Sequence, residues 1–247
     1  MNSRRNIQLV LGFDGAAYHG WQIQEHQKTV QGELRDAIQK ITGEQVNPVG
    51  SGRTDAGTHA RGFVSNFTTG ARIPLRSLIR ALNSVLPRDI RVLRAQAVPA
   101  DFHSRHSARA KIYRYQIYRG AIMPPHLARE HFHFPYPLNL ALMEQAAGLF
   151  IGSHDFASFA AKGSGKENTV RQIYSCRMKS AGHRLTFTVE GNGFLHHMVR
   201  NMVGTLLELG RGLITLPEFE ALFALRDRTQ AGFTVPACGL ILIRVKY

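Results

Sequence analysis

The residues best suited to chemistry lie in the glycine-rich segment Gly50 to Ala60, GSGRTDAGTHA. This segment carries one carboxylate, Asp55, and glycines let a turn bring backbone close to a ligand. If Arg53 to Asp55 is extended, their side chains point the same way and the guanidinium favours an ionised carboxylate. Such a carboxylate can act as a nucleophile or a base. The spacing is equally that of an Arg and Asp pair that only fixes a surface turn.

A second candidate is Tyr113, in the stretch Lys111 to Arg119. The alternation of this stretch predicts a strand with large side chains on both faces. Together with Tyr115 it is an aromatic residue on a strand, a feature that RNA-binding sheets also have. Its hydroxyl can also exchange a proton, and a tyrosine of the protein core would fit the same pattern.

Histidines suggest a metal site, because imidazole is the commonest metal ligand in proteins. The sequence has no HExxH motif, and we expect His196 and His197 on a helix, where adjacent side chains diverge by about 100 degrees and cannot face one ion. We therefore predict packing and phosphate contact for the histidines, and no metal site.

A polar loop is predicted for Ala160 to Thr169, AAKGSGKENT. It lacks the phosphate-loop spacing GxxxxGK[ST], because Glu167 stands where a Ser or Thr would bind magnesium. Its lysines, Lys162 and Lys166, and the neighbouring Arg171 are expected to contact an RNA backbone.

Apolar periodicity predicts the elements that must position these residues. Strands are expected at 7–13, on both sides of the glycine-rich loop within 46–67, and at 90–98, 111–119, 170–178, 185–189 and 240–247; helices are expected after Thr29 and Pro74, at 140–150, over 195–206 and after Pro217. Strands and helices interleave without the rhythm of a doubly wound sheet, which predicts an α+β fold with two ferredoxin-like halves. The predicted halves are 1–105, with Asp55, and 106–247, with Tyr113.

The chain is strongly basic. Its 31 Lys and Arg face 17 Asp and Glu, a formal net charge of +14, which favours a polyanionic partner such as a nucleic acid, although charge can also serve solubility alone. The two cysteines are far apart, so neither a disulfide framework nor a zinc knuckle is indicated. The sequence has neither a signal-peptide pattern nor an apolar stretch long enough for a membrane span, so we expect a cytoplasmic protein.

Four stretches resemble blocks of the bacterial tRNA pseudouridine synthase A family. GRTDAGTHA is close to that family's GRTDAGVHA; the others are FDGAAYHGWQIQ (13–24), DFHSRHSARAKIYRYQIY (101–118) and NGFLHHMVRNMVG (192–204). The departures are small: Phe13 replaces a tyrosine, Thr58 a valine and Ile23 a residue that is often basic. The lost charge at Ile23 would weaken one phosphate contact at most, which a basic chain can supply elsewhere.

The resemblance implies roles for five residues. Asp55 would be the essential aspartate, Tyr113 the ring that stacks on the target uracil, Arg53 the active-site arginine and Arg200 a basic partner near the carboxylate, with Leu240 also in the substrate site. It further implies two halves that share a mainly antiparallel sheet flanked by helices, a homodimer, and action without a cofactor on uridines 38, 39 and 40 of the tRNA anticodon stem-loop.

Two other functions fit parts of the pattern. A non-catalytic RNA-binding protein with RRM-like halves would use strand aromatics such as Tyr113 and Tyr115. Such a binder gains nothing from Asp55 and should bind RNA no worse after Asp55→Asn. A nuclease or deaminase would normally show a metal site or an acid and base pair.

Overall fold

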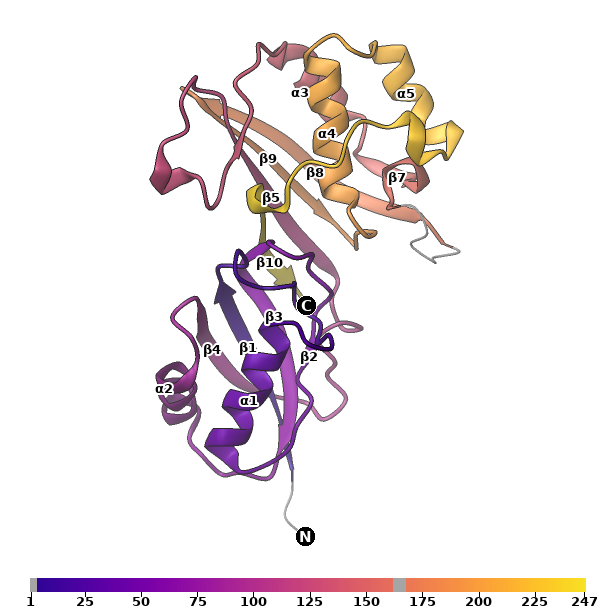
Figure 1. Cartoon of the computed structure of the whole chain (residues 1–247). Coiled ribbons are helices and arrows are strands. Elements are labelled where there is room, and N and C mark those ends of the chain that lie inside the picture. The colour runs from indigo at the N-terminus through magenta and orange to yellow at the C-terminus, as the bar shows by residue number, and fades with distance from the viewer. Residues whose placement is uncertain (1–3, 162–167) are drawn as a thin grey trace. The chain divides into compact units, whose positions relative to one another are not determined.

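The computed structural model describes residues 4–161 and 168–247. By packing, the chain forms two compact units: unit 1 comprises Met1–Arg109 and Leu242–Tyr247, and unit 2 comprises Ala110–Ile241 (Figure 1). The expected halves, 1–105 and 106–247, differ from these units chiefly at the C-terminus. Strand β10 (Leu240–Lys246) begins in unit 2 and ends in unit 1.

Unit 1 combines an antiparallel sheet with two helices. Its elements are β1 (Arg5–Phe13), α1 (Val30–Thr42), β2 (Val49–Gly50), β3 (His59–Thr69), α2 (Leu75–Val85) and β4 (Ile90–Val98). β1 lies between β3 and β4 and is antiparallel to both, so that Leu9 faces Ser65 on one side and Ala95 on the other. β2 and β10 also pair with β3.

The core of unit 1 follows from the predicted periodicity. Ile7, Leu9 and Leu11 of β1 are fully buried, and Leu34 of α1 and Leu82 of α2 pack in the same core. As expected, Thr29 caps α1, because its side chain accepts a hydrogen bond from the Gly32 N–H. The helix ends at Gly43, whose φ of 72° is a left-handed conformation that suits glycine.

Unit 2 has a second, mainly antiparallel sheet. Its strands are β5 (Ala110–Tyr118), β6 (Phe132–His133), β7 (Gly152–Asp155), β8 (Val170–Ala181) and β9 (Arg184–Gly191), and its α-helices are α3 (Leu140–Gly148), α4 (Met198–Gly210) and α5 (Leu216–Leu225). The strand order is β5-β9-β8-β7, with neighbours antiparallel; β6 pairs in parallel with β5.

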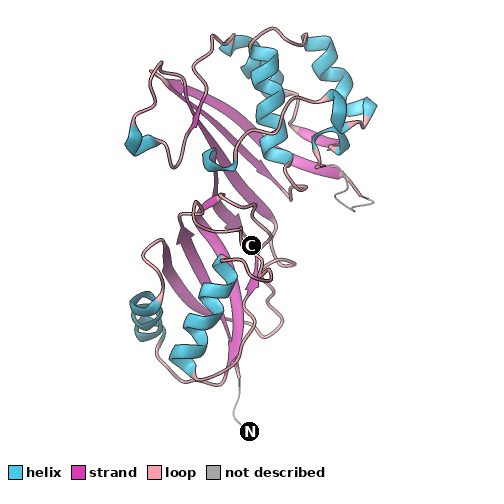
Figure 2. Cartoon of the chain, in the orientation of Figure 1, coloured by secondary structure: helices cyan, strands magenta, loops and turns pink. Residues whose placement is uncertain are grey.

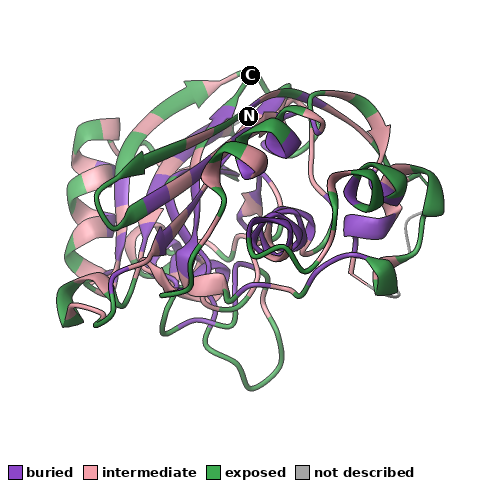
Figure 3. Ribbon diagram, turned by 90° about the horizontal axis from the view of Figure 1, so that it is seen from above, coloured by how far each residue is buried: buried purple, intermediate pink, exposed green. Residues whose placement is uncertain are grey.

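Helices cover one face of this sheet. α3, α4 and α5 contact one another, and α4 and α3 contact β5 and β8 (Figure 2). The strand residues on the helix side, such as Tyr115 and Phe187, are buried, whereas Arg114, Thr188 and Arg177 are in register with one another on the opposite face. Figure 3 shows the buried segments of strands and helices in purple and the exposed segments in green. Of the residues of α4, only Arg200 and Glu208 are not buried.

The predicted mixed α/β fold with mainly antiparallel sheets is confirmed, and its errors are local. β6 and β7 are too short to leave a periodic signal. The helix expected from Leu195 begins at Met198, because His197 has a φ of 60°. The helix at Pro217 begins one residue earlier, where Thr215 and Glu218 form a capping box. Within residues 4–161 and 168–247, no helix is long and apolar enough to cross a membrane.

Candidate active site

The Asp55 loop, residues 51–58, joins β2 to β3 in unit 1. Its centre is a tight turn, in which the Thr58 N–H donates to the Asp55 carbonyl at 3.1 Å. Gly57 has a φ of 80°, the sign that a type II turn requires at its third position. Asp55 is half-buried and Arg53 is exposed, so the Ala-Gly pair after the carboxylate shapes the turn that presents it.

The Asp55 loop rests on residues 14–21, which we call the support segment. The Trp21 N–H donates to the Thr54 carbonyl at 3.3 Å, and the Gly57 N–H donates to the Tyr18 carbonyl at 3.2 Å. These bonds bracket Asp55. A Cβ at Gly20 would lie 2.1 Å from the Thr54 carbonyl oxygen, so only glycine permits this approach.

Tyr18 anchors the support segment. Its hydroxyl donates to Asp89 Oδ1 at 2.6 Å, just before β4. Burial, followed by the hydrogen bond to Asp89, raises the pKa of Tyr18 above its ordinary value. The phenol therefore remains a proton donor at neutral pH. No role was predicted for this segment from the sequence. Gly15 and Gly20, in the family-like block 13–24, were nevertheless a signal that backbones approach closely there.

Tyr113 lies on β5 in unit 2, opposite Val189 of β9. Its side chain is on the helix side of the sheet, where it is 9% exposed and packs edge to face on Phe194 with ring centroids 5.1 Å apart. It is therefore an aromatic ring that packs on Phe194 and keeps a small accessible surface. A base that stacks on it must use that surface.

Arg200 lies on α4 in the same unit, and its Nε donates to the Val235 carbonyl at 2.7 Å. The neighbouring Tyr115 hydroxyl donates to the Pro236 carbonyl at 2.7 Å; burial raises the pKa of this phenol, so it remains a donor. The two bonds hold the chain just before Leu240, which is 6% exposed at the start of β10.

The family-like block 192–204 also contacts the segment that precedes Leu240. A Cβ at Gly204 of α4 would lie 1.7 Å from the Phe233 carbonyl oxygen, so the segment crosses the helix where no side chain is present. The Asn201 amide oxygen accepts from Arg228 and from the Thr234 hydroxyl, at 3.0 and 2.6 Å. Gly204 and Asn201, the α4 residues near Arg200, thus hold residues 228–234 against the helix.

The expectation for the two adjacent histidines is wrong in its geometry. His196 and His197 precede α4, and the left-handed φ of His197 breaks the helical spacing. Their rings consequently lie close together, with centroids 3.9 Å apart and planes tilted by 41°, instead of diverging. A positive φ at a histidine is uncommon, and the sequence carries no signal for it.

The structure places Arg53 and Asp55 in one loop of unit 1, and Tyr113, Arg200 and Leu240 in unit 2. Lys162 and Lys166 lie outside the described residues. Arg171 is described: its Nη1 donates to the Asn168 and Val170 carbonyls, and its contact with RNA stays a prediction.

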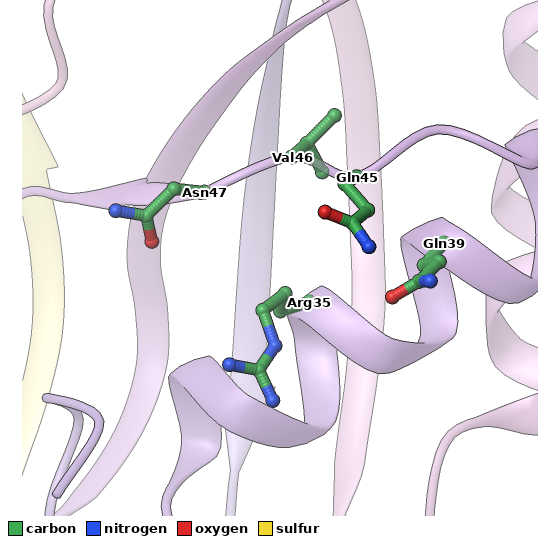
Figure 4. Close-up of a pocket in the computed structure, with 5 residues that line it drawn as sticks. All are labelled: Arg35, Gln39, Gln45, Val46 and Asn47. Carbon is green, nitrogen blue, oxygen red and sulfur yellow. The ribbon is translucent and has the colours of Figure 1, made fainter.

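A separate hollow lies on the surface of unit 1. It has a volume of about 410 Å³ and lies between α1 and the chain before β2 (Figure 4). Its lining is mostly polar and consists of Arg35, Gln39, Gln45, Val46 and Asn47. None of the predicted site residues is among them.

Comparison with known proteins assigns the chain to a protein family. A family model described as tRNA pseudouridine synthase matches residues 10–107 and 146–247. The chain belongs to that family, and it is therefore an isomerase that forms pseudouridine in tRNA. A non-catalytic RNA-binding protein is not favoured.

The relatives agree along the whole chain, and they are named tRNA pseudouridine synthase A. Those from Thermoanaerobacter sp. (strain X514) and Moorella thermoacetica are 44% and 46% identical over 243 residues, which is 98% of this chain and 100% and 99% of theirs. The relative from Lacticaseibacillus casei is 43% identical over 98% of this chain and 99% of its own. A solved chain of the archaeal box H/ACA sRNP Nop10-Cbf5 complex covers 82% of this chain and 43% of its own at 13% identity; its TM-score of 0.34 is too low to define a fold.

Proposed function

We propose that this chain converts uridines 38, 39 and 40 of the tRNA anticodon stem-loop to pseudouridine, with Asp55 as nucleophile and without a cofactor. The observation that carries the proposal is the Asp55 turn. In a basic chain of this family, a half-buried carboxylate is held on both sides by backbone hydrogen bonds. A carboxylate fixed in this way is pre-organised for attack.

The reaction is balanced without any added group. The bond between uracil N1 and ribose C1′ breaks, the base turns, and a bond forms between C5 and C1′; C5 loses a proton and N1 gains one. The Asp55 carboxylate serves either by attack at C1′ or by attack on the pyrimidine ring, and it is released when the new bond forms. Because nothing is oxidised, reduced or exchanged, no redox group and no second substrate is needed.

The remaining residues would bind the flipped nucleotide. Extruding a base costs a few kcal/mol, and aromatic stacking returns about 1–3 kcal/mol per base. We assign that stacking to Tyr113. The exposed Arg53 and the α4 residue Arg200 would supply positive charge to phosphate or carboxylate, and Leu240 would supply an apolar contact.

Mapping pseudouridine in total tRNA tests the substrate and the positions together. In cells that lack this protein, carbodiimide-dependent primer-extension stops should disappear at positions 38, 39 and 40 and persist at other pseudouridines. Expression of the unaltered chain should restore them. Loss of stops at a different tRNA position would overturn the proposed site, and an unchanged map would overturn the proposed function.

We also propose that the enzyme acts as a homodimer. Unit 2 exposes large apolar side chains, among them Ile122 at 84%, Tyr136 at 50% and Phe233 at 40%, and exposed apolar patches often mark interfaces. Sedimentation equilibrium at assay concentrations should give twice the 27.6 kDa mass of the chain. A single species with the mass of one chain, at full activity, would contradict the dimer.

A further inference from the structure

A hydrogen bond between two side chains anchors the support segment in unit 1. Asp89 lies in the turn between α2 and β4, and its Oδ1 accepts the Tyr18 hydroxyl at 2.6 Å. An ionised carboxylate can only accept, and hydrogen bonds to a charged acceptor are the stronger kind. Tyr18 is 2% exposed, so its hydroxyl has little access to water as an alternative partner.

Asp89 holds the support segment at two places. Its carbonyl accepts the Asp14 N–H at 2.9 Å, and its carboxylate holds Tyr18 four residues later. The turn that carries Asp89 is itself closed, because the Ile90 N–H donates to the Pro87 carbonyl at 3.1 Å, and Ile90 is fully buried. The turn before β4 thus gives the first half of the support segment a fixed base.

Tyr18 connects this base to the Asp55 loop through its own backbone. Its N–H donates to the Gly15 carbonyl inside the support segment at 3.0 Å, and its carbonyl accepts the Gly57 N–H at 3.2 Å. Gly57 follows Asp55 by two positions, in the turn that presents the carboxylate. Two hydrogen bonds in series, one from the phenol and one to the carbonyl, therefore join the turn before β4 to the turn of Asp55.

The backbone bond on the other side of this turn has a separate anchor. Trp21 donates to the Thr54 carbonyl, and its own carbonyl accepts the Gln31 N–H of α1 at 3.0 Å. Its ring packs on Phe63, with ring centroids 4.3 Å apart. Loss of the Tyr18 hydroxyl should therefore loosen one side of the turn and leave the loop attached on the other.

From these contacts we propose that Tyr18 and Asp89 are positioning residues, whose side-chain hydrogen bond holds the Asp55 turn in its reactive geometry. The inference rests on the proposed role of Asp55 as nucleophile. Neither side chain needs to touch the substrate. Displacement of a reacting group by about 1 Å costs about 100-fold in rate, so a turn loosened on one side should lower kcat by about 10- to 100-fold. Because charge on many surface residues carries tRNA affinity, KM should stay within about twofold.

Three substitutions test whether this hydrogen bond sets the rate. Tyr18→Phe keeps the ring and removes the donor. Asp89→Asn keeps an oxygen that can accept the bond, whereas Asp89→Leu keeps the size of the side chain and removes both oxygens. With saturating tRNA, we expect Tyr18→Phe and Asp89→Leu to lose about 10- to 100-fold in kcat and Asp89→Asn to stay within about fivefold of the unaltered chain. Full kcat in Tyr18→Phe, or equal losses in the two Asp89 variants, would overturn the proposal.

A second tyrosine of unit 1 provides the matched control. The Tyr247 hydroxyl donates to the Ser104 carbonyl at 2.7 Å, so Tyr247→Phe removes a tyrosine hydrogen bond whose partner lies outside the Asp55 loop and the support segment. We expect this variant to keep full kcat. Rates are compared at a temperature at which thermal unfolding shows each variant to be folded. If Tyr18→Phe lowers only the unfolding temperature, its bond serves stability alone and the proposal fails.

A double-mutant cycle tests whether the two residues act through one bond. Tyr18→Phe combined with Asp89→Leu should then lower kcat no more than either change alone, and multiplicative losses would contradict the shared role. The nucleophile and its positioning are tested separately. If Asp55→Ala keeps full activity, the proposed nucleophile fails; if Asp55→Ala is inactive while Tyr18→Phe keeps full kcat, the positioning inference fails alone.

Discussion

The variant Asp55→Ala should bind tRNA with the affinity of the unaltered chain and form no pseudouridine. The carboxylate supplies the covalent step, and removal of an enzymatic nucleophile lowers kcat by at least about 10,000-fold. Binding should persist because charge on many surface residues carries tRNA affinity. Filter binding and carbodiimide primer extension on the same preparation measure the two properties.

A second carboxylate of unit 1 provides the control for this result. Asp36 is exposed on α1, where it forms an ion pair with Arg35 at 2.8 Å, and Asp36→Ala should leave both binding and product formation unchanged. Asp55→Ala itself lies in a loop and should change the free energy of unfolding by no more than about 0.5 kcal/mol. Normal product from that variant would remove Asp55 from the reaction.

Tyr113→Ala should lose about 10- to 100-fold in kcat/KM. Without the ring, the extruded uracil has no stacking surface, and this contact is worth about 1–3 kcal/mol. The loss should be larger with a duplex stem, where unpairing must be offset, than with a uridine in an open loop. Steady-state kinetics on two short RNAs, one with the target uridine paired and one with it unpaired, measures this difference.

Two further substitutions define what Tyr113 contributes. Tyr113→Phe keeps the stacking ring and removes the hydroxyl, so activity close to that of the unaltered chain assigns stacking alone, and a large loss assigns proton transfer to the hydroxyl. Tyr174 lies on β8 of the same unit and is 49% exposed; Tyr174→Ala should be neutral. Equal losses from Tyr113→Ala and Tyr174→Ala would remove the specific role of Tyr113.

Local signals predicted most of the fold. The alternation in β1, the Thr29 cap and the Pro74 start of α2 are each set by neighbouring residues, so the sequence contains what is needed to place them. The division of β10 between the two units depends on contacts between residues far apart in the sequence, and neither periodicity nor capping encodes these. The two-residue strand β6 exists only through its pairing with β5.

In the candidate site, too, features set by neighbouring residues could be predicted, whereas contacts between distant residues could not. Glycines beside Asp55 marked the loop, and similarity to a family assigned its carboxylate. The sequence carries little signal for the segment that supports this loop, because the hydrogen bonds from Trp21 and to Tyr18 use backbone atoms that every residue type shares. His59 drew only the general expectation of packing and phosphate contact for the histidines, since Asp14, whose Oδ1 lies 3.1 Å from its Nδ1, is distant in sequence and becomes a neighbour only through the pairing of β1 with β3.

The most direct test of the account is a single-turnover reaction with Asp55→Asn, enzyme in excess over a tRNA labelled at the target uridine. This change keeps the size of the side chain and removes its charge and nucleophilic oxygen. After digestion to nucleotides, we predict that all label remains in uridine at times when the unaltered chain has converted it fully. Label in pseudouridine, at a rate near that of the unaltered chain, would contradict the account.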